Sequence, residues 1–193
     1  MHPQDAWADE SFAESDDGKG VYVVAAALFE GELNHVRHVM RGIRTRQHQD
    51  KLHWSKMDPA ERRKAAEQVA AIGGLNIVAI ASPVPRRRQE RARAACLGAL
   101  VPELHGYEVT RLYVESRGQV LDRRDVDVVR ACRWSAPASP PLRLEHRRGA
   151  AEPLLWVADI VAGACRSHRQ GREPEYREAL GDLVYDIEVD SGC

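Results

Sequence analysis

Cysteine is scarce in this chain of 193 residues, and its placement argues against a cysteine-based metal or redox site. No two cysteines have the spacing of a zinc-binding or redox motif. His168 lies three residues after Cys165, but no second ligand pair accompanies it, so zinc is not expected. We interpret the thiols as reduced and expect a cytoplasmic protein. The four cysteines are Cys96, Cys132, Cys165 and Cys193.

Long apolar runs are also missing. No segment is long enough to span a bilayer, and no charged start leads into an apolar run, so we expect neither a membrane protein nor a signal peptide. The formal net charge is only -1, which neither favours nor excludes a nucleic-acid partner. Lysine is rare, and most of the 28 basic residues are arginine. Arginine suits phosphate recognition, but a GC-rich genome produces the same bias.

The length and an ordinary composition, 44% hydrophobic and 30% charged, suit a single domain over residues 1–193, and no repeat divides the chain. The strands expected at 6–11 and 21–29 should form a hairpin. Asp9, Glu10 and Ser11 are then expected at one strand end, beside a turn at 16–20. The order of elements predicts an α/β fold, in which a mixed β-sheet has helices on both faces. Apolar runs predict strands at 6–11, 21–29, 75–81, 109–116 and 142–146, and periodicity predicts helices at 33–44, 59–72, 86–105, 122–132, 152–164 and 173–185.

The segment 152–164 is predicted to be a buried helix with one charged side chain at its middle. Pro153 suits a first helical position, and the run that follows is apolar almost all round. Asp159 must therefore meet a cation, a metal or water in a cleft, because burying an unpaired charge is costly. Glu152 precedes it by seven residues, about two helical turns, and is expected on the same face. The alternative is an ordinary core helix at whose edge Asp159 faces an arginine or solvent.

Three acids occupy comparable places among the predicted elements. Asp9 is expected to close the first strand, Glu115 closes an internal apolar strand, and Asp159 sits in the buried helix. Sites in open α/β sheets gather at strand ends, so these carboxylates are candidates to converge. Converging carboxylates repel each other unless cations hold them, and their hard oxygen atoms suit Mg²⁺ or Mn²⁺. Two such ions can activate a water and stabilise the leaving oxygen of a phosphodiester. The other interpretation is that each acid is solvated at the edge of the sheet.

Short motifs spread over most of the chain resemble one family. Residues 8–11, Ala-Asp-Glu-Ser, resemble the Asp-Glu-Ser start of the domain-of-unknown-function 3800 family, and residues 51–55 look like its Lys-x-x-Trp-Ser stretch. Glu115 stands where the family has an acid at a strand end, and residues 154–163 resemble its Leu-Leu-Gln-x-Ala-Asp-x-x-Ala-Gly helix. The resemblance implies an RNase-H-like fold with an acidic metal site. Its ligands would be Asp9, Glu115 and Asp159, with Glu10 and Glu152 as extra ligands.

The chain departs from that family at three places. Glu115 stands where Asp is commoner, Trp156 replaces the usual Gln of the helix, and Phe12 follows Ser11 where Gly is expected. The longer Glu115 side chain would shift a metal, and Trp156 removes a polar group near the site. The three central acids are all present, and the activity of the family itself is generally unassigned.

Basic side chains near these motifs are candidates for holding a phosphate. Lys51 can contact a scissile phosphate or form a structural salt bridge with Glu10. His53 can contact a phosphate or move a proton, or it can simply be hydrogen-bonded in a half-buried strand. Arg147 and Arg148 precede the buried helix, where they can neutralise phosphates or balance nearby acids.

The residues and the resemblance together predict a nuclease that depends on Mg²⁺ or Mn²⁺, with the three central acids as ligands and Glu10 or Glu152 assisting. The alternative is a non-catalytic interaction or nucleic-acid-binding module, which can be a homodimer and in which the acids are structural. Carboxylates clustered in a basic-walled cleft would favour the nuclease, and acids apart or each tied to an arginine would favour the module. A deep closed pocket would instead favour hydrolysis of a small phosphate ester. Trp54 and Trp156 can stack on bases or belong to the core.

Overall fold

The computed structural model describes residues 4–15, 18–43, 50–135 and 141–193 and shows one mixed six-stranded sheet, as predicted for an α/β fold. The strand order is β5-β4-β1-β2-β3-β6. β1 pairs antiparallel with β2, which pairs antiparallel with β3, whereas the three other pairings are parallel. The strands are β1 (Gln4–Glu14), β2 (Gly20–Leu28), β3 (Leu75–Val84), β4 (Val109–Glu115), β5 (Arg143–Arg147) and β6 (Val184–Val189).

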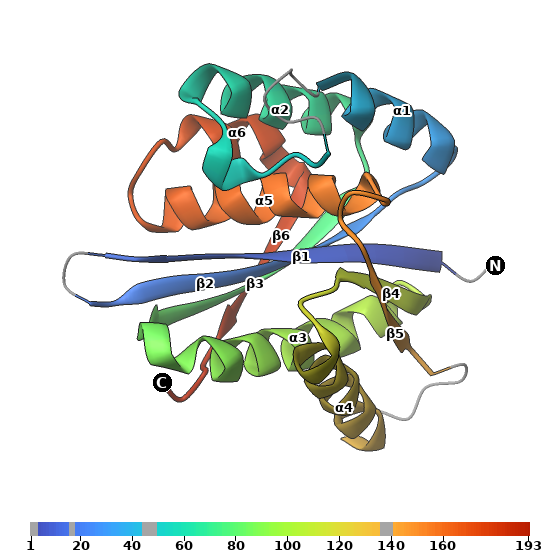
Figure 1. The fold of residues 1–193 in the computed structure, drawn as a ribbon, viewed down its shortest axis with the longest axis vertical. Helices are drawn as coiled ribbons and strands as arrows, with labels where there is room; N and C mark the ends of the chain where they lie inside the picture. Colours follow the sequence, from blue (N-terminus) through green and yellow to red (C-terminus); the bar gives the residue numbers. More distant parts are fainter. Residues whose placement is uncertain (1–3, 16–17, 44–49, 136–140) are drawn as a thin grey trace.

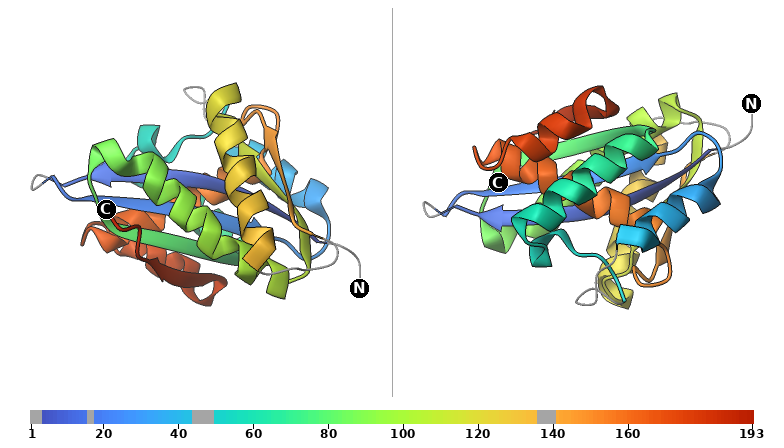
Figure 2. Two further views of the ribbon diagram at one scale, coloured as in Figure 1. Left: turned by 90° about the horizontal axis from the view of Figure 1, so that it is seen from below. Right: turned by 90° about the horizontal axis from the view of Figure 1, so that it is seen from above.

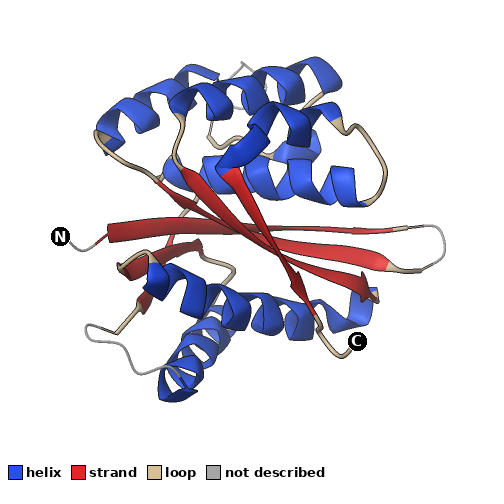
Figure 3. Cartoon of the chain, turned by 180° about the vertical axis from the view of Figure 1, so that it is seen from behind, coloured by secondary structure: helices blue, strands red, loops and turns tan. Residues whose placement is uncertain are grey.

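Helices cover both faces of the sheet, as the apolar strands require (Figures 1 and 3). One face carries α1, α2, α5 and α6, and the other carries α3 and α4; Figure 2 shows the two layers from opposite sides. Every residue of β2 is buried, which confirms its prediction as a central strand. The helices are α1 (Leu33–Ile43), α2 (Pro59–Ile72), α3 (Gln89–Gly106), α4 (Gln119–Ser135), α5 (Leu154–Arg169) and α6 (Glu175–Leu180). None of the helices in the described part of the chain could cross a membrane.

The predicted hairpin between the first two strands is confirmed, but the position of Asp9 in it was predicted wrongly. The pairing runs from Ala6 opposite Leu28 to Glu14 opposite Gly20, and Asp9 lies opposite Ala25 in the middle of β1. The strand continues past the polar residues because its backbone groups go on pairing with β2. Asp9 and its neighbours are therefore not at a strand end, and successive side chains from Asp9 onward point to alternate faces of the sheet.

Two further predictions failed at strands near the sheet edge. The segment predicted as a helix over 173–185 contains only the short α6, because Gly181 adopts a left-handed φ of 48° after Leu180. The chain then forms β6, whose backbone pairs in parallel with β3. β3 itself continues through Pro83 to Val84, three residues beyond the predicted end of the strand at residue 81.

The predicted buried helix is α5, which packs across β1 and β2. Gly163 lets the ring of Trp54 lie directly on its backbone, since a Cβ at that position would overlap the indole. Trp54 and Trp156 are each only 1% exposed, so both belong to the core and cannot offer a stacking surface to a base. The Trp156 indole nitrogen donates to the carbonyl of Gly149 at 2.7 Å.

Candidate functional site

Three carboxylates from three elements come together on the α5 side of the sheet. Ala8 and Val114 are partners in the parallel β1–β4 ladder. The next residue of each strand, Asp9 in β1 and Glu115 at the end of β4, therefore lies beside the other. Lys51 joins them, because its Nζ lies 3.4 Å from Asp9 Oδ2 and contacts Glu115 Oε2. The Lys51 side chain is only 9% exposed, so this ammonium group is held inside the cluster.

Asp159 enters the same cluster from α5. Its Oδ2 accepts a hydrogen bond of 2.9 Å from the backbone N–H of Trp54, which draws the segment around Lys51 onto the helix. Gly149 closes another side, since a Cβ there would overlap both the Glu115 carboxylate and the Lys51 side chain. We call Asp9, Glu115, Asp159 and Lys51 the acid cluster.

The acid cluster has more negative than positive charge. Burial raises the pKa of Asp9 well above its usual value, and the neighbouring Glu10, Asp159 and Glu115 raise it further, while Lys51 opposes the shift. Burial also raises the pKa of Asp159 to about 6, against the hydrogen bond from Trp54 and the charge of Lys51. Burial alone would lower the pKa of Lys51, but the carboxylates of Asp9 and Glu115 outweigh this and raise it. One ammonium group thus faces three carboxylates.

The donor chemistry of the acid cluster fits a hard divalent cation, although the side chains are not arranged around one. Within the described ranges, no three acid, histidine or cysteine side chains form a group that could hold a metal. The ammonium of Lys51 contacts both Asp9 and Glu115, and so acts as a stand-in cation between them. Mg²⁺ and Mn²⁺ bind buried carboxylate oxygens whose negative charge is not balanced by nearby cationic side chains. Metal binding would therefore require Lys51 to withdraw.

Glu10 and Glu152 lie outside the acid cluster, each paired with arginine. Glu10 points to the opposite face of the sheet, where its Oε2 lies 2.6 Å from Arg93 Nη1. Glu152 precedes α5 rather than lying in it, and both of its oxygens accept hydrogen bonds of 2.9 Å from Arg37. Lys51 accordingly pairs with Asp9 and Glu115, while the Glu10 carboxylate is engaged by Arg93.

The predicted phosphate-binding residues lie in segments that adjoin the acid cluster in the sheet or along the chain. Arg147 is the β5 partner of Glu115, but its guanidinium pairs with Glu145 at 2.8 Å and lies 4.8 Å from the centre of the Tyr113 ring. Arg148 follows it and is exposed. His53 is half-buried and has an extended backbone. It is the residue before Trp54, whose backbone N–H binds Asp159.

An ionic network on the far face of the sheet was missed by sequence reasoning. Arg93 is 1% exposed and makes two hydrogen bonds to Asp125, of 2.9 and 2.8 Å, besides its contact with Glu10. Arg117 also contacts Asp125, at 3.3 Å, and His146 Nε2 lies 3.3 Å from the same carboxylate. Burial opposes ionisation of Asp125, but these partners lower its pKa to about 2. The network holds β1 from the α3 side of the sheet through Glu10, the residue after Asp9.

One signal in the sequence could have revealed this network. Arg93 lies in the helix predicted at 86–105 and has helical spacing with Leu97, Leu100 and Leu104. All three leucines are fully buried on α3, so an arginine in the same stripe must be buried as well. A buried arginine requires acidic partners.

The raised pKa values of Asp9 and Asp159 predict an unusual dependence of stability on pH. A carboxyl that holds its proton more tightly when folded stabilises the protein at low pH, and this contribution is lost as pH rises through the folded pKa. Without added metal, we expect the free energy of unfolding to fall between about pH 4 and pH 7. Urea denaturation across this range would measure it, with a shallower fall in Asp159→Asn. A stability that rises steadily over the range would contradict the prediction. Asp125 does not interfere, because its pKa of about 2 lies below the window.

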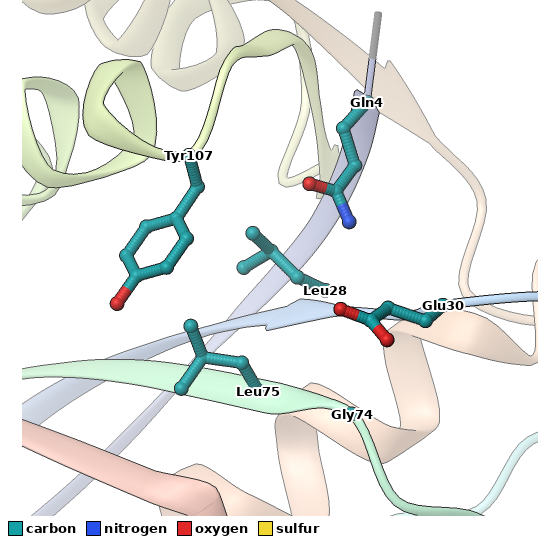
Figure 4. Close-up of a pocket in the computed structure, with 6 residues that line it drawn as sticks. All are labelled: Gln4, Leu28, Glu30, Gly74, Leu75 and Tyr107. Carbon is teal, nitrogen blue, oxygen red and sulfur yellow. The ribbon is translucent and has the colours of Figure 1, made fainter. Parts of the chain in front are cut away.

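A pocket of about 250 Å³ lies elsewhere, beside the start of β1. Its lining includes Gln4, Glu30 and Tyr107 around Leu28 and Leu75 (Figure 4). Gln4 is five residues before Asp9, about 16 Å along an extended strand. None of the predicted site residues lines this pocket, so it forms no part of the candidate site.

Comparison with solved structures identifies the fold. A chain of the PCNA:RNase HII complex from Archaeoglobus fulgidus matches with a TM-score of 0.51 and 19% identity, over 92% of this chain and 77% of that one. Ribonuclease H2 from Pyrococcus horikoshii OT3 matches with a TM-score of 0.49 and 13% identity, over 93% and 81%. No family model and no curated protein matches the chain. The likeness to the first of these confirms the predicted RNase-H-like fold and, at 19% identity, concerns the fold alone.

Proposed function

We propose that this chain is a nuclease that hydrolyses phosphodiester bonds with the help of Mg²⁺ or Mn²⁺. The observation that carries the proposal is the acid cluster, in which three carboxylates from β1, β4 and α5 surround a single ammonium group. Such an arrangement is costly to bury without further positive charge. The RNase-H-like fold supports the proposal, because the solved structure that matches with a TM-score of 0.51 is a complex that contains RNase HII.

In this proposal each residue of the acid cluster has a distinct role. Asp9, Glu115 and Asp159 would hold the metal, which would activate a water and stabilise the leaving oxygen. Lys51 leaves its carboxylate partners and donates to the scissile phosphate, because an ammonium group on a flexible side chain can follow the charge. Around it, His53, Arg147 and Arg148 contact the flanking backbone of the nucleic acid.

Other parts of the proposal depend on the sequence. Membership of the domain-of-unknown-function 3800 family remains a prediction from the motifs around Asp9, Lys51, Glu115 and Asp159. A cytoplasmic location is supported by free cysteine thiols, two of which, Cys96 and Cys165, are buried.

The second candidate is a non-catalytic interaction or nucleic-acid-binding module. The pairing of Glu10 with Arg93 and of Glu152 with Arg37 favours it, because these two acids are structural ion pairs. In such a module Lys51 would remain permanently between Asp9 and Glu115.

Metal binding and cleavage separate the two candidates. Mn²⁺ is titrated into the protein by calorimetry, and labelled single- and double-stranded RNA and DNA, together with an RNA–DNA hybrid, are incubated with Mg²⁺, Mn²⁺ or chelator. The nuclease proposal expects heat of Mn²⁺ binding and metal-dependent cleavage of at least one substrate. No binding at millimolar Mn²⁺ and no cleavage, by protein shown to be folded, would favour the module.

A further inference from the structure

A second charged group, of opposite sign, lies beside the acid cluster. Arg62 of α2 and Arg172 in the segment after α5 each lie close enough to Arg166 of α5 to influence it electrostatically. Burial lowers the pKa of Arg166, and the positive charges of Arg62 and Arg172 lower it further. We call these three residues the arginine cluster.

Trp54 connects the arginine cluster directly to the acid cluster. Its backbone N–H donates to Asp159 at 2.9 Å, and its carbonyl accepts a hydrogen bond of 3.3 Å from Arg62 Nε. The guanidinium carbon of Arg62 also lies 5.3 Å from the centre of the Trp54 ring. A single residue therefore contacts both charged groups.

A second connection runs through β1. Arg166 Nε donates to Ser11 Oγ at 2.9 Å, and Ser11 is two residues after Asp9 on the same face of the strand. Asp159 and Arg166 are likewise seven residues apart on α5, which corresponds to about 10 Å along the helix axis. That distance is spanned by about three nucleotides of a stacked strand, at 3.4 Å per nucleotide.

The arginine cluster has an excess of positive charge. The hydrogen-bond partners of the Arg166 guanidinium are neutral oxygens, Ser11 Oγ and Gln170 Oε1 at 2.9 and 3.0 Å. Arg62 Nη1 contacts the carboxylate of Glu173 at 3.3 Å. The carboxylates of Glu173 and Asp159 also act on Arg166, but neither forms a hydrogen bond with its guanidinium, unlike those that each bind Arg37 or Arg93 through two hydrogen bonds.

We propose that Arg62, Arg166 and Arg172 form a subsite for backbone phosphates of a nucleic-acid strand, about three nucleotides from the acid cluster. A guanidinium group offers paired donors that match phosphate oxygens, and it remains charged when half-buried. Because the residues come from α2, α5 and the following segment, they fix the direction in which the strand leaves the acid cluster. This inference deepens the proposed function and rests on it.

Binding of labelled oligonucleotides in chelator tests the subsite without requiring cleavage. The probes are fluorescein-labelled single-stranded RNA and DNA of about twelve nucleotides, and anisotropy is measured over a series of salt concentrations. We expect the double variant Arg62→Gln/Arg172→Gln to bind about 25-fold more weakly at about 0.1 M salt, since each lost phosphate contact lowers the slope of log K against log salt by about 0.7. Arg172→Gln alone, an exposed change that leaves the core intact, should bind about fivefold more weakly.

Arg63→Gln is the matched control. Arg63 is next to Arg62 on α2, but its side chain is 63% exposed and pairs with Glu175, so its loss should change affinity less than about twofold. If Arg172→Gln and the double variant bind within about twofold of the wild type, or if the wild type binds neither probe at low salt, the subsite is refuted.

Cleavage then distinguishes this inference from the proposed function. In an active enzyme the double variant should raise KM and leave kcat nearly unchanged, because the subsite binds the strand away from the reacting bond. Binding that depends on Arg62 and Arg172 without any cleavage would refute the nuclease and keep the subsite. Cleavage with a KM that does not change in the double variant would support the nuclease and refute the subsite.

Discussion

Asp159→Asn is expected to lower phosphodiester cleavage by at least about a hundredfold and to abolish Mn²⁺ binding, while the protein stays folded. The amide oxygen can still accept the hydrogen bond from Trp54, so the contact between α5 and the preceding segment survives. What disappears is one of the three negative charges that attract the metal. Cleavage rates with saturating substrate and calorimetric titration with Mn²⁺ measure the two losses.

The same change should increase stability when metal is absent. Burial and neighbouring acids raise the pKa of Asp159 to about 6, so its charged form destabilises the folded protein at neutral pH. Removing that charge should raise the free energy of unfolding by roughly 1–3 kcal/mol at pH 7. A gain in stability together with a loss of activity identifies a functional acid, because removal of a structural ion pair would lower stability.

Asp127→Asn is the matched control for this prediction. Asp127 is 60% exposed on α4 and pairs with Arg130 one helical turn away, so the same chemical change should alter neither activity nor stability measurably. Retention of cleavage and Mn²⁺ binding in Asp159→Asn would rule out Asp159 as a ligand and favour the interaction module.

Arg93→Met is expected to destabilise the protein by about 3–5 kcal/mol, the largest stability loss that we predict for any single substitution here. Methionine fills much of the space among the leucines of α3, so the packing loss is small. The cost arises because Glu10 and Asp125 lose their shortest contacts with a cation, at 2.6 and 2.8 Å. The remaining contacts with Arg117 are longer, at 3.8 and 3.3 Å. The change in free energy is measured by urea denaturation at pH 7 and checked against the thermal midpoint.

Arg111→Met tests whether burial is the cause. Arg111 makes the same two-pronged contact with Asp5, at 2.9 and 3.0 Å, but its side chain is 49% exposed. Its loss should cost at most about 1 kcal/mol, because water solvates the remaining carboxylate. Equal costs for the two variants would show that the network around Arg93 has no special role in supporting β1.

Much of the fold could be predicted because it follows from local patterns. The continuous apolar run of β2 indicated a strand buried on both faces, and the adjacent β1 indicated a hairpin, since neighbouring strands commonly pair. The apolar run of α5 indicated a buried helix, and the charge of Asp159 within it indicated a site. The error at β6 arose because the predicted helix was carried past Gly181 to residue 185. The segment Val184–Val189 contains Val, Tyr and Ile, residue types that favour strands, and it pairs with the edge of β3.

The candidate site was predictable in part for the same reason. Asp9, Glu115 and Asp159 could be selected individually, because each is an acid within or beside an apolar element. Their convergence depends on the parallel pairing of β1 with β4 and on the packing of α5 over both strands, which are contacts between residues far apart in the sequence. The sequence resemblance suggested this convergence, but the order of strands established it.

What the sequence determined by itself is therefore the type of each central element and the presence of charged residues within apolar surroundings. Only the tertiary structure decided that Lys51 is the cation of the acid cluster, that Glu10 belongs to Arg93 on the opposite face, and that the arginine cluster lies beside Asp159. Periodicity is a property of neighbouring residues and can be read from a single segment. The partner of a buried charge is decided by strand order and helix placement, which bring together side chains that no local pattern relates.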